Sequence, residues 1–571
     1  MKKILYYLKE YYFSMCIGLF IKFTGTIMDL LIPSVLARMI DDVAPSGNIP
    51  AIFIWGGVMI ICALTAVICN IAANRMAAKA ASGCTEKLRR DLFKKISYLS
   101  CRQTDTVSVP SLISRVTSDT YNVHQVVGSM QRLGVRAPIL LVGGIMVTMT
   151  LEPALTMALV AALPLLTLAV YWVSKKGIPL YAEAQKSTDA LVRKAQEYMT
   201  GVRVIKALSK SEYEKSKFDE VNSDVVKKEQ KAGIVMSVTN PVMNLLLNCG
   251  LTSVIIIGAF RVNAGATQTG KIIAFLSYFT LILQAMMSIT RMFVMFSKGA
   301  ASAERIAEVL DMEEDIKPTP EDYTESARHI VFKNVSFSYN KARDNISDVS
   351  FSLKKGETLG IIGPTGSGKT TVINLLLRLY DADSGEIRIN GMNITGIPDD
   401  VLHKKFGIAF QNDFLTADSI KENIAFGRDI CDDDINAAAA SAQAKEFIDA
   451  ADGGFSYKLT VKGANLSGGQ KQRLLIARAL AGKPEILILD DSSSALDYKT
   501  DAELRKAIRR DFKDTTAIII SQRISSIMNA DHIMMLEEGK CTGYGTHEEL
   551  LETSGAYREI NEIQMGAGIY E

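Results

Sequence analysis

The chain has 571 residues, a formal net charge of +2 and 48% apolar residues. This length exceeds what one hydrophobic core supports, so we expect at least two domains, and the near-neutral charge predicts no nucleic-acid partner. The eight cysteines show no metal-ligand spacing and indicate buried thiols, not a disulfide framework. No cleavable signal sequence is expected, because Lys2, Lys3 and Lys9 lead into a long apolar helix without a small-residue cleavage site.

Six apolar stretches in the first 300 residues are long enough to cross a bilayer, which takes about 20 residues. They lie at residues 12–38, 50–74, 134–150, 153–174, 235–260 and 271–297. The connections after the second and fourth stretches are long and rich in Lys and Arg, whereas residues 41–50 carry acids and no base. The bias of basic residues toward the inner face therefore predicts that both long connections and both termini lie in the cytoplasm.

The two long connections are predicted to extend the membrane helices into the cytoplasm, because residues 78–99 and 181–231 are rich in helix formers. Their tips are expected at residues 112–119 and 197–206, where they would press on a cytoplasmic domain. Pro138, Pro164 and Pro241 are expected to kink helices, which a helix bundle tolerates.

Charged residues inside the spans are costly and usually face a bundle interior or a wet cavity. Lys22 and Asp29 lie seven residues apart, on one face of the first helix. Substrate contact, an ion pair with another helix and snorkelling by Lys22 all remain open. Arg136 and Arg291 lie near helix ends and are predicted to be interfacial anchors or internal pairs.

A change of composition marks the end of the membrane half. Residues 302–326 contain an acidic run and two prolines, which is typical of a linker. We therefore expect a transmembrane domain at 1–310, a linker at 311–328 and a second domain at 329–571.

The second domain contains the sequence Gly-Pro-Thr-Gly-Ser-Gly-Lys-Thr, which matches the phosphate-loop pattern G-x-x-x-x-G-K-[ST]. A predicted strand at 358–362 precedes it and a predicted helix at 371–377 follows, as the pattern requires. Glycines turn backbone N–H groups toward phosphate, Lys369 would reach the β- and γ-phosphates, and the Thr370 hydroxyl would ligate Mg²⁺. The residues predicted to hold the nucleotide are Gly363, Pro364, Thr365, Gly366, Ser367, Gly368, Lys369, Thr370 and Thr371.

Three further motifs follow: Leu-Ser-Gly-Gly-Gln at 466–470, an apolar strand at 486–489 ending in Asp490 and Asp491, and Ser-Ala-Leu-Asp at 494–497. With the phosphate loop and the six spans, essentially the whole chain resembles an ATP-binding cassette exporter half-transporter. This resemblance implies an all-α six-helix transmembrane domain with long cytoplasmic extensions, fused to an α/β P-loop nucleotide-binding domain. It also implies an ATPase coupled to transport, with ATP and Mg²⁺ as its cofactors.

The resemblance assigns roles around the phosphate loop. Asp490, at the end of its buried strand, would hold Mg²⁺ together with Thr370. Gln411 would contact Mg²⁺ and the attacking water, and Tyr339 would stack on adenine. A surface glutamine and a surface tyrosine are the plain alternatives for these two residues.

The signature motif has its own implied role. In this family two nucleotide domains close head to tail, so that each ATP lies between one chain's phosphate loop and the other chain's signature. Ser467, Gly468, Gly469 and Gln470, at a predicted helix start, would therefore complete the ATP site of a second chain. Residues 459–465 lack the G-E-R usually seen before the signature, which leaves their part in cross-talk with the membrane domain open.

Two catalytic positions depart from the family pattern. Asp491 stands where the family has a glutamate that orients the attacking water, and its carboxylate falls about 1.5 Å short. Misplacement on that scale costs on the order of a hundredfold in rate, or about 2.7 kcal/mol. Gln522 replaces the family's histidine, and a neutral amide cannot become cationic. The two changes predict a site that binds ATP and turns it over slowly; drift in a dead protein is the alternative, although every binding element is intact.

These features favour one subunit of a heterodimeric exporter in a lipid bilayer, whose partner half-transporter carries the missing glutamate and histidine. The expected substrate is an amphipathic drug, a peptide or a lipid. A slow homodimer, a lipid flippase, a regulatory subunit that gates its partner, and import on an exporter-like scaffold stay open. The composition suits a bacterial inner membrane, with the nucleotide domain in the cytoplasm.

Overall fold

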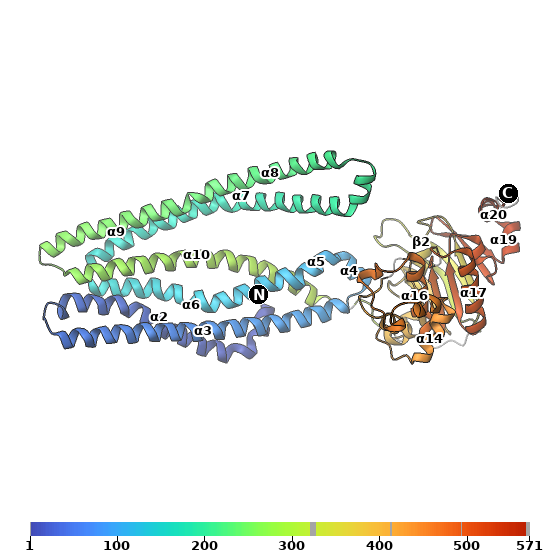
Figure 1. The fold of residues 1–571 in the computed structure, drawn as a ribbon, viewed down its shortest axis with the longest axis horizontal. Coiled ribbons are helices and arrows are strands. Elements are labelled where there is room, and N and C mark those ends of the chain that lie inside the picture. The colour runs from blue at the N-terminus through green and yellow to red at the C-terminus, as the bar shows by residue number, and fades with distance from the viewer. Residues whose placement is uncertain (1, 314, 320–326, 412–413, 493, 567–571) are drawn as a thin grey trace. The chain divides into compact units, whose positions relative to one another are not determined.

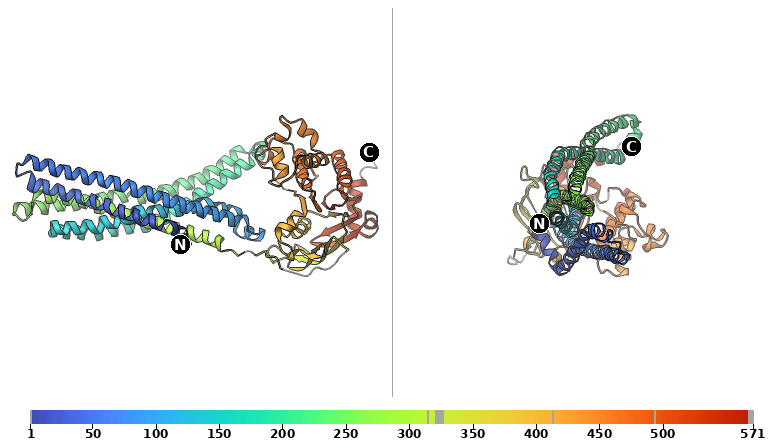
Figure 2. Two further views of the ribbon diagram at one scale, coloured as in Figure 1. Left: turned by 90° about the horizontal axis from the view of Figure 1, so that it is seen from below. Right: turned by 90° about the vertical axis from the view of Figure 1, so that its left-hand side faces the viewer.

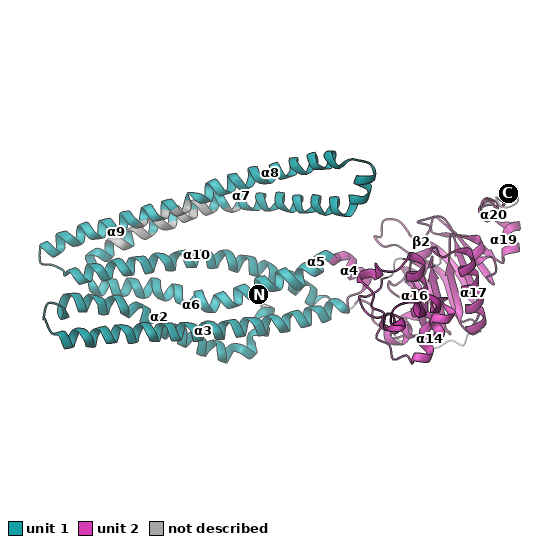
Figure 3. Ribbon diagram, viewed as in Figure 1, with its two compact units in different colours: residues 1–97, 110–312 teal, residues 98–109, 313–571 magenta. Residues whose placement is uncertain are grey.

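The computed structural model covers residues 1–571 and describes residues 2–313, 315–319, 327–411, 414–492 and 494–566 (Figure 1). Some side chains between residues 158 and 178 and between 239 and 247, and those of residues 2 and 290, lie outside the described part. Two compact units emerge, one of residues 1–97 and 110–312, the other of residues 98–109 and 313–571 (Figure 3). Each is described by itself.

The first unit is helical throughout its described residues. The long helices α2, α3, α6, α7, α9 and α10 lie side by side, with α2 packed on α3, α6 on α10, and α7 on both α8 and α9 (Figures 1 and 2). The bounds are α1 Lys2–Leu8, η1 Lys9–Tyr11, α2 Tyr12–Arg38, η2 Met39–Val43, α3 Ile49–Ser97, α5 Val109–Ser114, η3 Arg115–Asp119, α6 Thr120–Leu151, α7 Pro153–Ala207, α8 Ser211–Ser237, α9 Thr239–Asn263 and α10 Thr269–Asp311.

The predicted membrane spans fall on these helices. By length and composition, five runs of the described residues can cross a membrane: Lys3–Val43, Ile49–Ser97, Val109–Leu151, Asn244–Asn263 and Thr269–Asp311. The expected span at 153–174 lies on α7, where many side chains are outside the described part. Large apolar side chains such as Phe13, Phe53 and Phe260 are more than 70% exposed, as expected for a surface that lipid covers.

The predicted extensions beyond the membrane spans are helical, but the first tip lies earlier in the chain than predicted. Helix α3 ends at Ser97 and the chain turns through α4 (Cys101–Val107), which packs with the second unit. Ser100 caps α4 in a capping box with Gln103, and Ser108 takes a left-handed φ of 69°, which ends the helix. Residues 112–119 lie instead in α5 and η3, beyond the turn.

The second tip follows the predicted segment directly. Helix α7 runs to Ala207 and α8 starts at Ser211, so residues 197–206 form the last turns of α7. Pro138 and Pro164 lie inside α6 and α7 as predicted. Pro241 lies in the first turn of α9, four residues after Ser237, the last residue of α8, so α8 and α9 are divided where the missing Pro241 N–H would have met the Ser237 carbonyl oxygen.

The second unit holds two sheets. Strands β2, β1, β4 and β5 form an antiparallel sheet, and a six-stranded, mostly parallel sheet has the order β10-β9-β3-β8-β7-β6. The strands are β1 Ile330–Phe337, β2 Ile346–Leu353, β3 Thr358–Ile362, β4 Ser384–Ile389, β5 Met392–Asn393, β6 Phe406–Ala409, β7 Ile486–Asp490, β8 Thr516–Ile520, β9 His532–Glu537 and β10 Lys540–Gly545.

Helices cover these sheets (Figure 1). They are α11 Lys369–Leu376, α12 Asp399–Lys404, α13 Ile420–Ala425, α14 Asp432–Ser441, α15 Lys445–Asp449, α16 Gly468–Ala481, α17 Tyr498–Asp511, α18 Ile524–Ile527, α19 His547–Thr553 and α20 Gly555–Met565, with single turns at η4 Ile394–Gly396, η5 Gly454–Ser456 and η6 Val461–Gly463. The expected strand at 358–362 is β3, and the expected helix at 371–377 begins two residues earlier, as α11.

The register of the parallel strands places their carboxyl ends together. Strands β3 and β7 both flank β8, and Ile520 of β8 is level with Ile361 of β3 and with Asp490 of β7. Strand β6 lies beside β7, with Ala409 level with Leu489. Because these strands are parallel, the segments that follow β3, β6, β7 and β8 share one edge of the sheet. In such sheets, ligands bind beyond the carboxyl ends of the strands.

Candidate functional site

The predicted phosphate loop connects β3 to α11 at that edge. Gly363 has no room for a side chain, because a Cβ there would lie 2.0 Å from the carbonyl oxygen of Leu536. Gly366 has a φ of 84°, in the left-handed region that glycine favours. The Lys369 ammonium lies against the loop and donates to the carbonyl oxygens of Gly363 at 2.8 Å and Pro364 at 2.7 Å. Burial lowers the pKa of Lys369, an effect that Asp490 and Asp491 oppose.

A cavity of about 230 Å³ opens between the strand ends. It brings together residues that are far apart in the chain and that follow four different strands. Its lining residues are Asn345, Thr365, Gly366, Gly368, Lys369, Thr370, Thr371, Gln411, Asp490, Asp491, Ile520 and Gln522. The residues predicted to hold phosphate, to bind the metal and to act on the attacking water therefore share one cavity.

The predicted metal ligands contact each other in this cavity. The Thr370 hydroxyl donates to Oδ2 of Asp490 at 3.1 Å, and Asp490 is only 2% exposed. Burial, and then the like charge of Asp491, raise the pKa of Asp490. One hydroxyl and one carboxylate fit Mg²⁺, which usually keeps several waters and takes its other ligands from substrate phosphates. A bound cation would offset the cost of burying the carboxylate.

Asp491 lies beside Gln411. Nε2 of Gln411 donates to Oδ2 of Asp491 at 3.3 Å, and the Asp491 backbone N–H donates to the carbonyl oxygen of Ile520 at 3.0 Å. Asp491 has a φ of 45°, a conformation that Asp adopts more readily than most residues. Burial raises its pKa, whereas Lys369 and Arg523 lower it. The carboxylate can thus accept a proton or orient a water at the cavity wall.

Tyr339 lines a second cavity of about 860 Å³, together with Asn345 and residues 364–367. Thr365 and Gly366 line both cavities, so the two are contiguous along the phosphate loop. The Tyr339 ring is 40% exposed and meets Tyr380 edge-on, with ring centroids 5.0 Å apart. A flat aromatic face beside the phosphate loop is suited to stack on a nucleotide base.

Two residues that sequence reasoning missed hold Tyr339. Nδ2 of Asn374 donates to its hydroxyl at 3.0 Å, and Oδ1 of Asn345 accepts from its backbone N–H at 3.1 Å. Asn345 also lines both cavities. In the sequence, Asn345 could have been connected with Tyr339 through its position, six residues later and just before β2.

The signature residues are separate from both cavities. Ser467 caps α16 in a capping box: its hydroxyl accepts from the Gln470 backbone N–H at 3.3 Å, and Oε1 of Gln470 accepts from the Ser467 N–H at 2.9 Å. Ser467 and Gly468 are exposed at the helix start. The structure thus brings the phosphate-loop, metal and water-orienting residues together and leaves residues 467–470 on the surface, so their role toward a second chain stays a prediction.

Residues 15–286 match the family model of the ABC transporter transmembrane region, and residues 346–494 match that of the ABC transporter. An uncharacterized ABC transporter ATP-binding protein of Bacillus subtilis strain 168, YfiB, is 36% identical over 568 residues, covering 99% of each chain. The chain belongs to the ABC transporter family.

Two further proteins are similar to this ABC transporter over almost its whole length. YheI of Bacillus subtilis strain 168, described as a probable multidrug resistance ABC transporter ATP-binding/permease protein, is 32% identical over 578 residues and covers 99% of this chain and 97% of its own. A solved structure of a bacterial Atm1-family ABC exporter with ATP bound has the same fold, with a TM-score of 0.81, 21% identity and 98% coverage of both chains.

The family fixes the general character of the molecule. The chain is a multi-pass membrane protein that fuses a helical transmembrane domain to an α/β nucleotide-binding domain, in the fold of an ABC exporter half-transporter. Its ABC transporter domain implies ATP binding, with Mg²⁺ as the usual cofactor, and an ATPase coupled to transport.

The charged residues of the membrane half have partners in this ABC transporter. Lys22, only 3% exposed, donates to Oδ1 of Asn70 at 2.8 Å and of Asn74 at 3.2 Å. Asp29 pairs with Arg136 at 3.1 Å, so Arg136 forms the internal pair that was one of its two predicted roles. Nδ2 of Asn70 also donates to Oδ2 of Asp29 at 3.5 Å, so Lys22 and Asp29 are joined through Asn70 in one set of contacts between helices.

Proposed function

We propose that this chain is one half of an ATP-driven exporter, that its own ATP site hydrolyses slowly, and that its signature completes the catalytic site of a different partner chain. The observation that carries the proposal is a contrast within one cavity. The phosphate-loop residues and the residues proposed to bind the metal line it together with Asp491 and Gln522, which the resemblance aligns with the family's glutamate and histidine.

The chain's own residues would bind the nucleotide firmly. Lys369 and the amides at the start of α11 would hold the β- and γ-phosphates, Tyr339 would cover the base, and Thr370 with Asp490 would hold Mg²⁺. Mg²⁺, when bound, neutralises developing phosphate charge. None of these contacts requires the missing glutamate or histidine.

Hydrolysis would be weak because both groups that act on the reaction are altered. The Asp491 carboxylate is about 1.5 Å shorter in reach than a glutamate. Its Oδ2 already accepts from Gln411, which directs it along the cavity wall. Gln522 can donate a hydrogen bond to a terminal phosphate but adds no positive charge as that phosphate leaves.

The exposed helix start at Ser467 supports a partner chain. Backbone N–H groups at residues 468–469, together with the Ser467 hydroxyl, form an anion-binding end that this chain's own cavities do not use. This chain has a complete signature and a weak catalytic site. Its signature would support hydrolysis if the partner chain carries the glutamate and histidine that this chain lacks. We therefore favour a heterodimer over a homodimer.

When ATP draws the nucleotide-binding domains of the two chains together, the turns between the long helices would transmit that movement to the membrane helices. Helix α4, in the turn between α3 and α5, already contacts the nucleotide-binding unit. The turn after α7, at residues 208–210, is the second candidate for transmitting the movement. We place the division of the chain at 1–310, 311–328 and 329–571, with residues 98–109 docked on the last part.

The transported compound is proposed to be amphipathic: a drug, a peptide or a lipid. The likeness to YheI, a probable multidrug resistance transporter, favours export of small amphipathic molecules. The relatives from Bacillus and other bacteria support a bacterial inner, or plasma, membrane with the nucleotide domain in the cytoplasm.

The test is the steady-state ATPase activity of the full-length chain, purified alone from membranes or co-expressed with its genomic neighbour. We expect activity near background alone and vanadate-sensitive turnover only with the partner. Lys369→Ala in this chain is the control for nucleotide binding at its own site. Turnover of several per second by the chain alone would sink the slow-site proposal and establish Asp491 as a sufficient catalytic carboxylate in a homodimer.

A further inference from the structure

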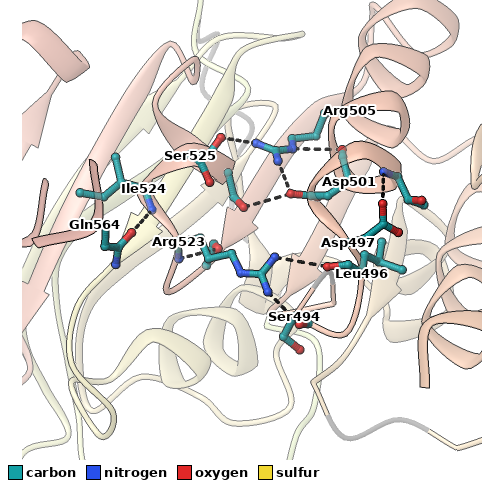
Figure 4. Close-up of polar contacts among 12 residues, drawn as sticks. Ser494, Leu496, Asp497, Asp501, Arg505, Arg523, Ile524, Ser525 and Gln564 are labelled. Carbon is teal, nitrogen blue, oxygen red and sulfur yellow. Dashed lines mark hydrogen bonds and ion pairs between the residues drawn. The ribbon is translucent and has the colours of Figure 1, made fainter. Parts of the chain in front are cut away.

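Gln522, which lines the ATP cavity, and Ile524, two residues further on, share one hydrogen-bond partner, the side-chain amide of Gln564 on α20. Nε2 of Gln564 donates to the carbonyl oxygen of Gln522 at 2.8 Å. Its Oε1 accepts from the backbone N–H of Ile524 at 2.8 Å (Figure 4). One amide thus satisfies an acceptor and a donor on either side of Arg523. This imitates the paired bonds between neighbouring β-strands and fixes the backbone of residues 522–524.

Helix α20 is itself held firmly at its other end. Tyr557 is fully buried in a core shared with Ile524 and Ile527 of α18 and with Ile362, the last residue of β3. The Tyr557 hydroxyl lies 2.7 Å from Nδ1 of His547 on α19. Since Ile362 directly precedes the phosphate loop, the same packing that positions Gln564 also adjoins the nucleotide cavity.

On the side away from α20, residues 522–524 are held by the region that follows β7. The Arg523 guanidinium donates to the carbonyl oxygens of Ser494 at 3.1 Å and Leu496 at 3.3 Å (Figure 4). It also lies over the Tyr498 ring, 5.0 Å from the ring centroid. On α17, Arg505 donates to the Ser525 carbonyl oxygen. Residues 522–525 therefore lie between two supports, and Gln564 supplies the side-chain hydrogen bonds from α20.

We propose that Gln564 is a positioning residue for the ATP site: by fixing the backbone at 522–524, it sets where the Gln522 side chain meets the terminal phosphate. The inference rests on the proposed function, in which Gln522 faces that phosphate. Without the amide, the buried Ile524 N–H loses its partner and the segment shifts to find another. A shift of about 1 Å is enough to weaken a contact to one phosphate by a large factor, while ADP, which lacks that phosphate, still binds.

The experiment compares affinities for Mg-ATP and Mg-ADP, measured by displacement of a fluorescent ADP analogue from the full-length chain in lipid nanodiscs. Gln564→Met keeps the length of the side chain and removes both hydrogen bonds. Gln564→Glu keeps the acceptor for Ile524 and loses the donor to Gln522. Gln522→Ala removes the group through which Gln564 acts, and Asn561→Ala changes an amide on the same helix for which the described residues show no hydrogen bond.

We expect Gln564→Met to weaken ATP binding about tenfold, the equivalent of one to two hydrogen bonds, with ADP binding within twofold of wild type. Gln564→Glu should fall between wild type and Gln564→Met, and Asn561→Ala should match wild type. Unchanged ADP affinity shows that the phosphate loop is folded in each variant.

Three results would overturn the inference, and they are distinguishable. If Gln522→Ala loses the preference for ATP but Gln564→Met keeps it, Gln564 does not position the segment and the proposed function stands. If Gln522→Ala keeps the preference, Gln522 does not face the terminal phosphate, and both the inference and that part of the proposed function fail. Equal losses of ATP and ADP affinity in Gln564→Met would indicate a purely structural role for α20.

Discussion

The hydroxyl of Tyr380 donates a 2.6 Å hydrogen bond to Oδ2 of Asp105 on α4. Tyr380 also meets Tyr339 edge-on, with ring centroids 5.0 Å apart. Burial, and then the bond to Asp105, raise the pKa of Tyr380, so its hydroxyl remains a donor at physiological pH. One tyrosine therefore links the aromatic residue proposed to cover the nucleotide base to the turn between two membrane helices.

Tyr380→Phe should separate ATP hydrolysis from its stimulation by substrate. The phenylalanine keeps the ring against Tyr339 and loses only the bond to Asp105, which is worth about 1 kcal/mol because Asp105 is exposed. Basal ATPase activity of the complex should stay within about twofold of wild type, and stimulation by transported compounds should fall severalfold. Tyr544→Phe, a hydroxyl loss elsewhere in the same unit, is the control. Full stimulation in Tyr380→Phe would mean that this contact carries no coupling.

Asp491→Glu combined with Gln522→His should raise hydrolysis at this chain's own site by roughly one to two orders of magnitude, because both altered groups are restored. Activity is measured in the complex with the partner's phosphate-loop lysine replaced, so that only this site can turn over. Asp491→Glu alone should also lower the unfolding temperature, since a φ of 45° suits Glu less well than Asp, at a cost of about 1 kcal/mol. No gain in the double variant would place the limitation outside residues 491 and 522.

The fold was predictable because its signals are local. An apolar run of about 20 residues needs no knowledge of its neighbours, and the start of α2 at Tyr12 and its end at Arg38 match the predicted span. The order strand, glycine-rich loop, helix likewise fixes the phosphate loop from residues close together in sequence. Parallel strands then bring Asp490 and Gln522 to one edge, so the cavity's principal residues could be named in advance.

What sequence reasoning missed depends on contacts between distant segments. The first turn lies at 98–109, after the end of α3 at Ser97, and α4 within it ends at Ser108, whose φ is positive. A serine at that position does not by itself predict a positive φ. The contacts of Gln564 with residues 522–524 join positions about 40 residues apart through an ordinary surface-type amide. Asn374 and Asn345 support Tyr339 in the same way, and nothing in their local sequence distinguishes them from other polar residues.

Lys22→Met should leave substrate selectivity unchanged. Lys22 is enclosed between α2 and α3 and bonded to two asparagines, so it holds helices together and does not face a substrate path. Met has a similar length but cannot donate to the Asn70 and Asn74 oxygens, so the unfolding temperature should fall, at a cost of about 1–3 kcal/mol. Asn70→Ala is the contrasting variant: it leaves Lys22 with one partner fewer and Asp29 without its amide donor, at a cost of about 1–3 kcal/mol. A changed substrate profile in Lys22→Met would restore the substrate-contact hypothesis.

His329 should make the nucleotide-binding unit less stable in mild acid. It is 3% exposed and its Nδ1 lies 2.6 Å from the Thr516 hydroxyl. Burial lowers its pKa, an effect only partly opposed by Glu485, so the neutral ring is favoured in the folded state. The unfolded chain then binds the proton more readily, with an ordinary histidine pKa of about 6.5. The contribution of neutral His329 to the free energy of unfolding is therefore complete above about pH 6.5. It is lost as the pH falls toward the lower pKa that His329 has in the folded state.

Calorimetry of the full-length protein, following the transition that Mg-ATP shifts to higher temperature, measures this dependence between pH 7.5 and 5.5. One proton contributes at most about 1.4 kcal/mol per pH unit to the slope. His329→Gln keeps a hydrogen-bonding side chain and cannot take up the proton, so its slope should be smaller even if the variant is less stable at every pH. His124→Gln, in the other unit, should keep the wild-type slope for this transition. Equal slopes in wild type and His329→Gln would show that acid destabilisation of the unit comes from other groups.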